Sequence, residues 1–125
     1  MDDVKNTRGI DRFFSAVEVI RREVNKDLAF SQFTLFLAIC VKEGQSVYDL
    51  IGHFKLPQPS TSKNLKELGK YIVTDKDGNK TVKGYDLIRA EPDLEERRIL
   101  VYYLTPKGQA LKEKIEKIIN GEIAV

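Results

Sequence analysis

One segment constrains the fold more than any other: residues 33–41, FTLFLAICV, are apolar nearly all round. Ser31, a residue type that caps helix N-termini, precedes the segment, and Lys42, Glu43 and Gly44 follow it as a typical helix end. A helix that is apolar on every side has to be buried on every side. The pattern therefore predicts a central helix around which the rest of the 125-residue chain packs.

Amphipathic helices are predicted near both ends of the chain. Residues 10–24 place apolar side chains three and four positions apart, with charged residues between them. The pattern returns from Pro106 to about Asn120, after Thr105 as a helix cap. Both apolar stripes are wider than one small core needs from a terminal helix. We therefore expect these two helices to hold a homodimer together.

Two shorter helices are predicted in the middle of the chain. Ser46 can cap a helix of about two turns that begins at Val47. Pro59 suits the first position of a further helix, PSTSKNLKEL, which ends before Gly69. The second of these helices has few apolar residues, and most of its side chains are small, hydroxylated, amide-bearing or basic. Such a helix is more polar than one that only supports a core.

Extended segments follow the polar helix. β-Branched residues flank the tight-turn sequence DKDGN, so a hairpin is predicted over residues 71–82. Residues 85–91 and 97–104 form a second extended pair, and an acidic turn connects them. Periodicity alone thus predicts an α+β fold that is mainly α, with the hairpins placed before the last helix.

Positive charge is concentrated in one part of the chain. The net charge is only +2, yet residues 55–89 contain eight basic and four acidic side chains. A local excess of this kind is the electrostatic pattern of a surface that meets phosphates, although a solvated lysine-rich face gives the same count.

Enzymatic and metal-dependent functions find little support in the composition. One cysteine cannot form an internal disulfide or a thiolate metal site, and one histidine excludes a His-rich site. Cys40 lies inside the apolar run of residues 33–41 and is interpreted as a core residue, so the sequence indicates no nucleophile–base pair. We therefore expect no enzyme activity, no cofactor and no metal. The N-terminal residues lack the apolar core of a secretory signal, and no segment is long and apolar enough for a membrane span, which predicts a cytoplasmic protein without membrane contact.

Two motifs resemble MarR-type transcriptional regulators. QPSTSKNLKEL resembles their recognition helix, and LIRAEPDLEERRILVYYLTPKG resembles their wing, in which an acidic residue, paired arginines, a strand and a Leu-Thr-x-x-Gly helix start follow in order. The wing residues that match are Asp93, Arg97, Arg98, Leu104, Thr105 and Gly108. The resemblance covers about residues 30–111 and implies a winged helix-turn-helix fold with N- and C-terminal dimerisation helices.

The resemblance also implies a function and an organisation for the chain. It implies a dimeric repressor that binds double-stranded DNA, with the recognition helix in the major groove and wing arginines in the minor groove. Residues 1–125 would form one domain, with dimerisation helices at 1–28 and 106–125 and the DNA-binding core and wing at 30–105. The DNA-binding residues would be Gln58, Ser60, Thr61, Ser62, Lys63, Lys66, Arg89, Arg97 and Arg98.

Several questions stay open at this point. Asp93 or Glu96 could orient one arginine of the pair, and the pattern does not say which arginine then reaches DNA. Residues 71–85 are an insertion before the wing, and they could contact DNA, contact a protein or do neither. The sequence identifies no small-molecule effector. The alternative function is a winged-helix protein-interaction module that acts on the transcription or replication machinery.

Overall fold

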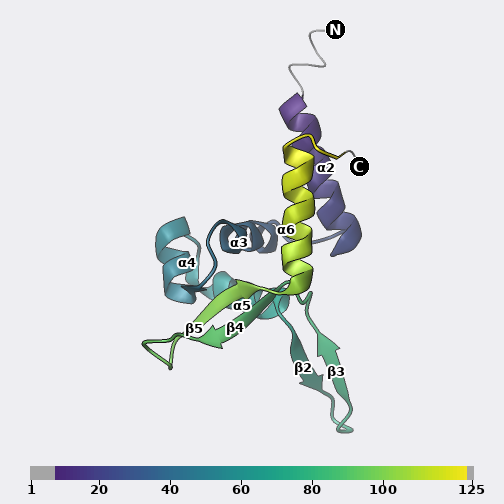
Figure 1. Ribbon diagram of the computed structural model, residues 1–125. Helices are drawn as coiled ribbons and strands as arrows, with labels where there is room; N and C mark the ends of the chain where they lie inside the picture. Colours follow the sequence, from purple (N-terminus) through teal and green to yellow (C-terminus); the bar gives the residue numbers. More distant parts are fainter. Residues whose placement is uncertain (1–7, 124–125) are drawn as a thin grey trace. The chain divides into compact units, whose positions relative to one another are not determined.

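The computed structural model describes residues 8–123 (Figure 1). The chain forms two compact units. Met1–Leu28 and Ala110–Val125 make the first unit, and Ala29–Gln109 make the second. The outermost residues of the predicted dimerisation segments, 1–7 and 124–125, lie outside the described residues. No helix in the described range is long and apolar enough to cross a membrane.

The first unit contains helix α2 (Arg8–Glu23) and most of helix α6 (Pro106–Ile119). Both helices were predicted, with bounds within two residues of those observed. Arg12 donates a hydrogen bond from its guanidinium to the carbonyl of Ile119 at 3.2 Å, and Lys114 forms an ion pair with Glu23. Long polar side chains thus connect the two helices along their length.

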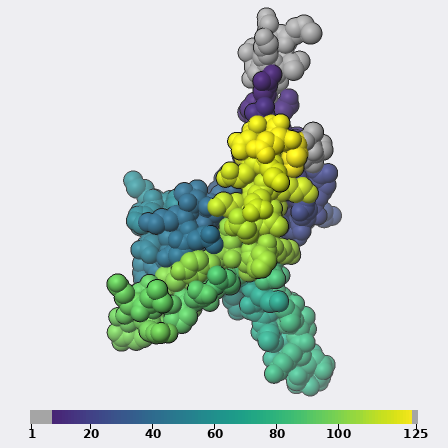
Figure 2. Space-filling model, viewed as in Figure 1, coloured from purple at the N-terminus to yellow at the C-terminus, as the bar shows by residue number. Residues whose placement is uncertain are grey.

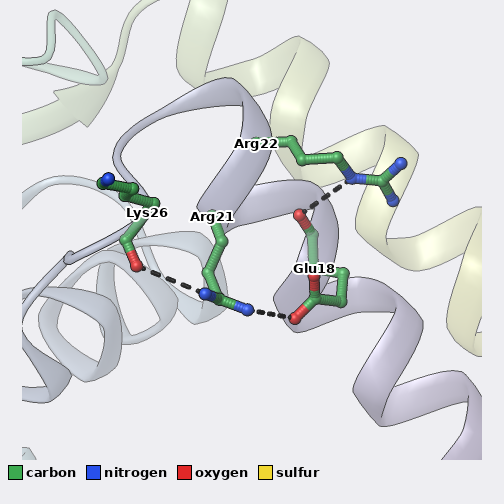
Figure 3. A network of polar contacts seen from close by, with 4 residues as sticks. All are labelled: Glu18, Arg21, Arg22 and Lys26. Carbon is green, nitrogen blue, oxygen red and sulfur yellow. Dashed lines mark hydrogen bonds and ion pairs between the residues drawn. The ribbon is translucent and has the colours of Figure 1, made fainter.

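A small network fixes the C-terminal end of α2 (Figure 3). Arg21 donates to the Glu18 carboxylate at 2.6 Å and to the carbonyl of Lys26 at 3.2 Å. Arg22 donates to the backbone carbonyl of Glu18 at 3.3 Å. These arginines bring positive charge and donors to a helix end where carbonyls lack intrahelical partners, which stabilises the exit from the helix.

The apolar stripes of the two terminal helices differ in exposure. In α6, Ile115 and Ile118 are buried within the single chain. In α2, Phe13 is 51% exposed and Phe14 is 63% exposed, and Ile10 is exposed beside them. The spacing of these three residues, i, i+3 and i+4, puts them on one face of the helix. The uncovered apolar surface of the first unit therefore includes a stripe at the N-terminal half of α2.

The middle of helix α3 (Phe30–Val41) is buried as predicted, since Leu35, Phe36 and Ile39 are almost completely inaccessible to solvent, but its last residue, Val41, is exposed. Its predicted start was wrong, because the N-cap is Ala29 rather than Ser31 and no side chain caps it. The carbonyl of Ala29 instead accepts the amides of Gln32 and Phe33 at 3.0 Å. Gln32 and Phe33 in this first turn are buried, whereas Phe30 is exposed, so the helix begins without a capping side chain and with only part of its first turn in the core.

Helices α4 (Val47–Phe54) and α5 (Gln58–Leu68) follow. Ser46 caps α4 as predicted, and the cap is reciprocal: the Ser46 hydroxyl accepts the Asp49 amide at 3.1 Å, and the Asp49 carboxylate accepts the Ser46 amide at 3.0 Å. Helix α5 begins one residue earlier than predicted, so Pro59 occupies its second position, where its missing N–H still costs no intrahelical bond.

A three-stranded antiparallel sheet, in the order β1-β5-β4, contains the wing. Its strands are β1 (Gln45–Ser46), β4 (Ile88–Pro92) and β5 (Leu100–Leu104). Ile88 pairs with Leu104 and Pro92 with Leu100. The strand predicted over residues 97–104 begins only at Leu100, because the Asp93 amide bonds to the Ile99 carbonyl at 2.8 Å and closes the hairpin there.

The predicted hairpin of residues 71–82 is confirmed as a separate two-stranded sheet of β2 (Tyr71–Thr74) and β3 (Lys80–Lys83). The cap of α6 is confirmed as well, since the Thr105 hydroxyl accepts the Gly108 amide at 3.0 Å. A Cβ at Gly108 would lie 2.0 Å from the Leu87 carbonyl oxygen. Glycine is therefore required where the start of α6 meets the backbone of Leu87, the residue before β4.

Candidate nucleic-acid interface

Helix α5 has one face in the core and one face in solvent. The buried residues are Thr61, Asn64, Leu65 and Leu68, at the i, i+3, i+4 and i+7 spacing of a helical stripe. Ser62, Lys63 and Lys66, away from this stripe, and Gln58, at the first position of the helix, have exposed side chains, as expected of residues that contact DNA. The outward face is therefore short, polar and basic, with no large apolar side chain.

Thr61 was predicted to face the major groove, and that prediction is wrong. Its exposed fraction is 3%, and its hydroxyl donates to the Pro57 carbonyl at 2.7 Å. Ser60 is half-buried and donates to the same carbonyl at 3.3 Å. Both hydroxyls thus donate to a carbonyl that precedes the helix, and Thr61 serves the fold because it belongs to the buried stripe of the helix.

Asp93 braces the wing tip by bonding to the backbone. Its carboxylate accepts the amides of Glu95 at 3.2 Å and Glu96 at 3.0 Å, and the Glu96 carbonyl accepts the Ile99 amide at 2.9 Å. These bonds define the turn that carries the two arginines. Asp93 therefore shapes the tip through main-chain bonds, rather than by pairing with an arginine.

The paired arginines occupy the turn and differ in their contacts. The Arg98 guanidinium lies 3.2 Å from the Glu96 carboxylate, yet the Arg98 side chain is 90% exposed. Arg97 is exposed, and no ion pair joins it to another residue in the described range. Of the two acidic candidates, Glu96 is the one that pairs with an arginine, and its partner is Arg98.

Arg89 is held on β4 instead of projecting freely. It forms an ion pair with Glu91 and its guanidinium lies 5.0 Å from the centre of the Tyr103 ring. Stacking and the carboxylate together orient this arginine. Its charge is partly compensated, so Arg89 presents less net positive charge than Arg97 does.

A cavity of about 430 Å³ joins the helix, the wing and the base of the β2–β3 hairpin. Three basic side chains line it, one from each element: Lys66, Lys70 and Arg89. Tyr102 also lines it, and burial raises the pKa of this phenol above its ordinary value. The cavity brings Arg89 together with Lys66 and Lys70, which precede it by 23 and 19 residues in the sequence.

Lys70 and Tyr71 belong to this site, although the sequence pattern did not assign them to it. For Lys70 a signal was present, because Lys63, Lys66 and Lys70 are spaced as one helical face. The Tyr71 ring lies 4.8 Å from the Lys66 ammonium. No sequence signal indicated this contact, since it depends on the angle at which the chain leaves α5.

Comparison with solved structures identifies the fold. A MarR variant from E. coli, crystallised with operator DNA, matches 97% of this chain and 71% of its own with a TM-score of 0.57 and 13% identity. A mutant of S. aureus MepR matches 97% and 77% with a TM-score of 0.58 and 15% identity. The repressor CouR, bound to a DNA duplex, matches 89% and 66% with a TM-score of 0.57 and 17% identity.

No protein-family model matches the sequence, and no curated protein is significantly similar to it. The structural matches nevertheless extend over nearly the whole chain. The chain has the winged helix-turn-helix fold of MarR-family transcriptional regulators, which confirms the fold that the two sequence motifs implied.

Proposed function

We propose that the protein is a cytoplasmic, sequence-specific regulator of transcription that binds double-stranded DNA as a homodimer and acts as a repressor. The observation that carries the proposal is the pairing of an outward polar and basic face on α5 with a wing whose tip exposes two arginines. Both occur on the fold of proteins whose structures were determined with DNA. Helix and wing of such a fold read adjacent parts of one duplex.

Gln58, Ser62 and Lys63 are the side chains proposed to enter the major groove. They lie in the first two turns of α5, are exposed, and carry the amide, hydroxyl and ammonium groups that bond to base edges. Lys66 lies one turn further along and is proposed to contact a phosphate. Ser60 has its hydroxyl bonded to Pro57, so it contributes less to recognition.

Arg97 is proposed as the arginine that enters the minor groove. It is exposed in the turn that Asp93 braces, and it has no carboxylate partner among the described residues. A guanidinium is weakly hydrated, so its transfer into a narrow groove of strongly negative potential is favourable. Arg98 is proposed to keep the turn in shape through Glu96 while also contributing charge.

The homodimer rests on the uncovered stripe of α2. Ile10, Phe13 and Phe14 expose apolar surface that a monomer leaves in water. A two-fold dimer would place two recognition helices on one face of the duplex, about one helical turn or 10 base pairs apart. That geometry predicts a palindromic binding site.

Selection of bound duplexes from a random pool tests the proposal. We expect enrichment of a palindrome, binding at least about a thousandfold tighter than to random DNA, and a steep fall in affinity with salt. Replacement of Ser62 by alanine should reduce the preference for the selected site and leave random-DNA affinity nearly unchanged. No enrichment, together with salt-independent binding to a protein of the transcription machinery, would replace the proposal with the interaction-module function.

A further inference from the structure

The β2–β3 hairpin is an exposed element that stands apart from the core of its unit. Its two strands pair only with each other in the described part of the chain, and every residue from Ile72 to Gly84 is exposed. Figure 2 shows the hairpin as a projection separate from the wing tip. Because a two-stranded hairpin is only marginally stable in isolation, its order has to come from its turn and from its attachment.

The attachment is to the C-terminal end of the proposed recognition helix. As the chain leaves β3, the amides of Tyr85, Asp86 and Leu87 donate to the carbonyls of Glu67, Gly69 and Leu68 at 2.8–3.0 Å. A Cβ at Gly84 would lie 2.1 Å from the Gly69 carbonyl oxygen, and Gly84 has a φ of +101°. The base of the hairpin is therefore locked against the last turn of α5.

The turn of the hairpin uses one of its two acidic side chains internally. The Asp75 carboxylate accepts the amides of Asp77 and Asn79, both at 2.9 Å, and the Asp75 amide donates to the Asn79 carbonyl. Gly78 supplies the positive φ that the turn requires. Asp75 thus stabilises a rigid tip, and its carboxylate is already hydrogen-bonded to the backbone.

Lysines dominate the charge of the hairpin. Residues 70–84 contain four lysines and two aspartates, a net charge of +2. Lys76, Lys80 and Lys83 are exposed, and none has an ion-pair partner among the described residues. Lys70 continues this charge into the cavity shared with Lys66 and Arg89. The positive surface therefore runs from the wing, past the helix, to the hairpin.

The apolar residues of the hairpin do not make a continuous surface for a protein partner. Ile72 is 62% exposed and pairs directly with Val82, which is 60% exposed. The same face of the ribbon carries Thr74 and Lys80 at the neighbouring pair, so a charge interrupts the apolar area. Lysine on a short edge strand also disfavours strand addition by another chain. A polyanion suits this face better than an apolar protein surface.

We propose that the β2–β3 hairpin is a second wing, which contacts phosphates of the same duplex next to the C-terminal end of the recognition helix. The inference rests on the DNA-binding function proposed above. A four-residue strand spans about 13 Å, comparable to the roughly 12 Å width of the major groove. A hairpin fixed at the helix end therefore reaches the sugar-phosphate backbone that borders the groove.

The test removes the three lysines of the hairpin together. The Lys76→Ala, Lys80→Ala, Lys83→Ala variant should lower the slope of log affinity against log salt by up to about 2.7, at about 0.9 for each phosphate that the variant no longer neutralises. Hydroxyl-radical footprints on the selected duplex should lose the outer part of the protected backbone. Preference for the selected site over random DNA should not change, because phosphate contacts carry no sequence information.

A matched control separates local contact from net charge. The Lys26→Ala, Lys112→Ala, Lys117→Ala variant removes the same charge from the first unit, and its salt slope should stay at the value of the unmodified protein. An equal loss of slope in this control, or an unchanged slope and footprint in the hairpin variant, overturns the second wing. The latter result would assign the hairpin to a protein partner.

The two proposals fail in different ways. If the unmodified protein shows no salt-dependent duplex binding, the DNA-binding function is wrong and the second wing is wrong with it. If the unmodified protein binds the selected duplex, and alanine at Lys63 or Lys66 weakens binding while the hairpin variant does not, only the second wing is wrong. Circular dichroism of each variant confirms that it is folded before its affinity is compared.

Discussion

Replacement of Phe13 and Phe14 by alanine should convert the proposed dimer to monomers. The two rings are 51% and 63% exposed in the single chain, at positions that place them on one face of α2. Full burial of a phenylalanine side chain contributes roughly 1.5–3 kcal/mol, so covering the exposed part of each ring contributes about 1–2 kcal/mol. A two-fold interface covers each ring twice, once in each protomer.

Four rings therefore contribute about 4–8 kcal/mol to association, and alanine retains only a small part of that surface. Every 1.4 kcal/mol changes a dissociation constant about tenfold, so the double variant should dissociate about a thousandfold more readily or worse. Sedimentation equilibrium over a series of protein concentrations measures this change directly. Binding to a palindromic duplex should weaken in parallel, while circular dichroism should show the same helix content.

Two comparisons make this result interpretable. Val41 and Tyr48 are equally prominent exposed apolar residues in the second unit, and alanine at either position should leave dimer dissociation unchanged. Ile118 is 2% exposed, so a charged residue there should unfold the chain rather than only separate protomers. The interface lies elsewhere if the unmodified protein is a monomer at every concentration, or if the phenylalanine variant dissociates like the unmodified protein.

Individual side chains give three further predictions. Arg97→Ala should reduce the salt slope of DNA binding by about 0.9, and Arg98→Ala by less; equal slopes for both variants would contradict the division of roles. Thr61→Val should lower the free energy of unfolding in urea by about 0.5–1.5 kcal/mol and leave DNA affinity unchanged, because it removes only the bond to Pro57. The hydrogen bond from the Ser46 amide lowers the pKa of Asp49 below its ordinary value. The ionised carboxylate therefore stabilises the fold fully when the pH is above the ordinary pKa, and this stabilisation is lost as the pH falls through the lowered pKa. Asp49→Ala should therefore reduce the melting temperature at neutral pH and converge with the unmodified protein in acid.

Local signals predicted most of the elements correctly. The all-round apolar run of α3, the Ser46 cap, the DKDGN turn and the Thr105 cap are each read from fewer than a dozen neighbouring residues. The physics that fixes these elements is short-range, so the sequence contains it explicitly. Element boundaries were less accurate where tertiary packing decides, as at Ala29, where no capping side chain is present.

The errors at the site have identifiable physical causes. Thr61 lies four residues before Leu65 and seven before Leu68, so the helical period already placed it on the buried side. Its prediction as a DNA contact gave its hydroxyl more weight than its position. The start of β5 could not be read from β-propensity. The backbone hydrogen bond from Asp93 to Ile99 closes the hairpin, so Arg97 and Arg98 lie in the turn rather than in the strand.

Helix α5 separates the requirements of folding from those of recognition. Thr61, Asn64, Leu65 and Leu68 bury its inner face, and substitutions there act through stability. The residues available for recognition are Ser62, Lys63 and Lys66, which lie away from the buried stripe, and Gln58, which is exposed at the first position of the helix. Their replacement should therefore cost little in folding while it changes the DNA sequence that is bound. A library randomised at these four positions should yield folded proteins with altered site preferences, and a library in which most members fail to fold would show that the two faces are not independent.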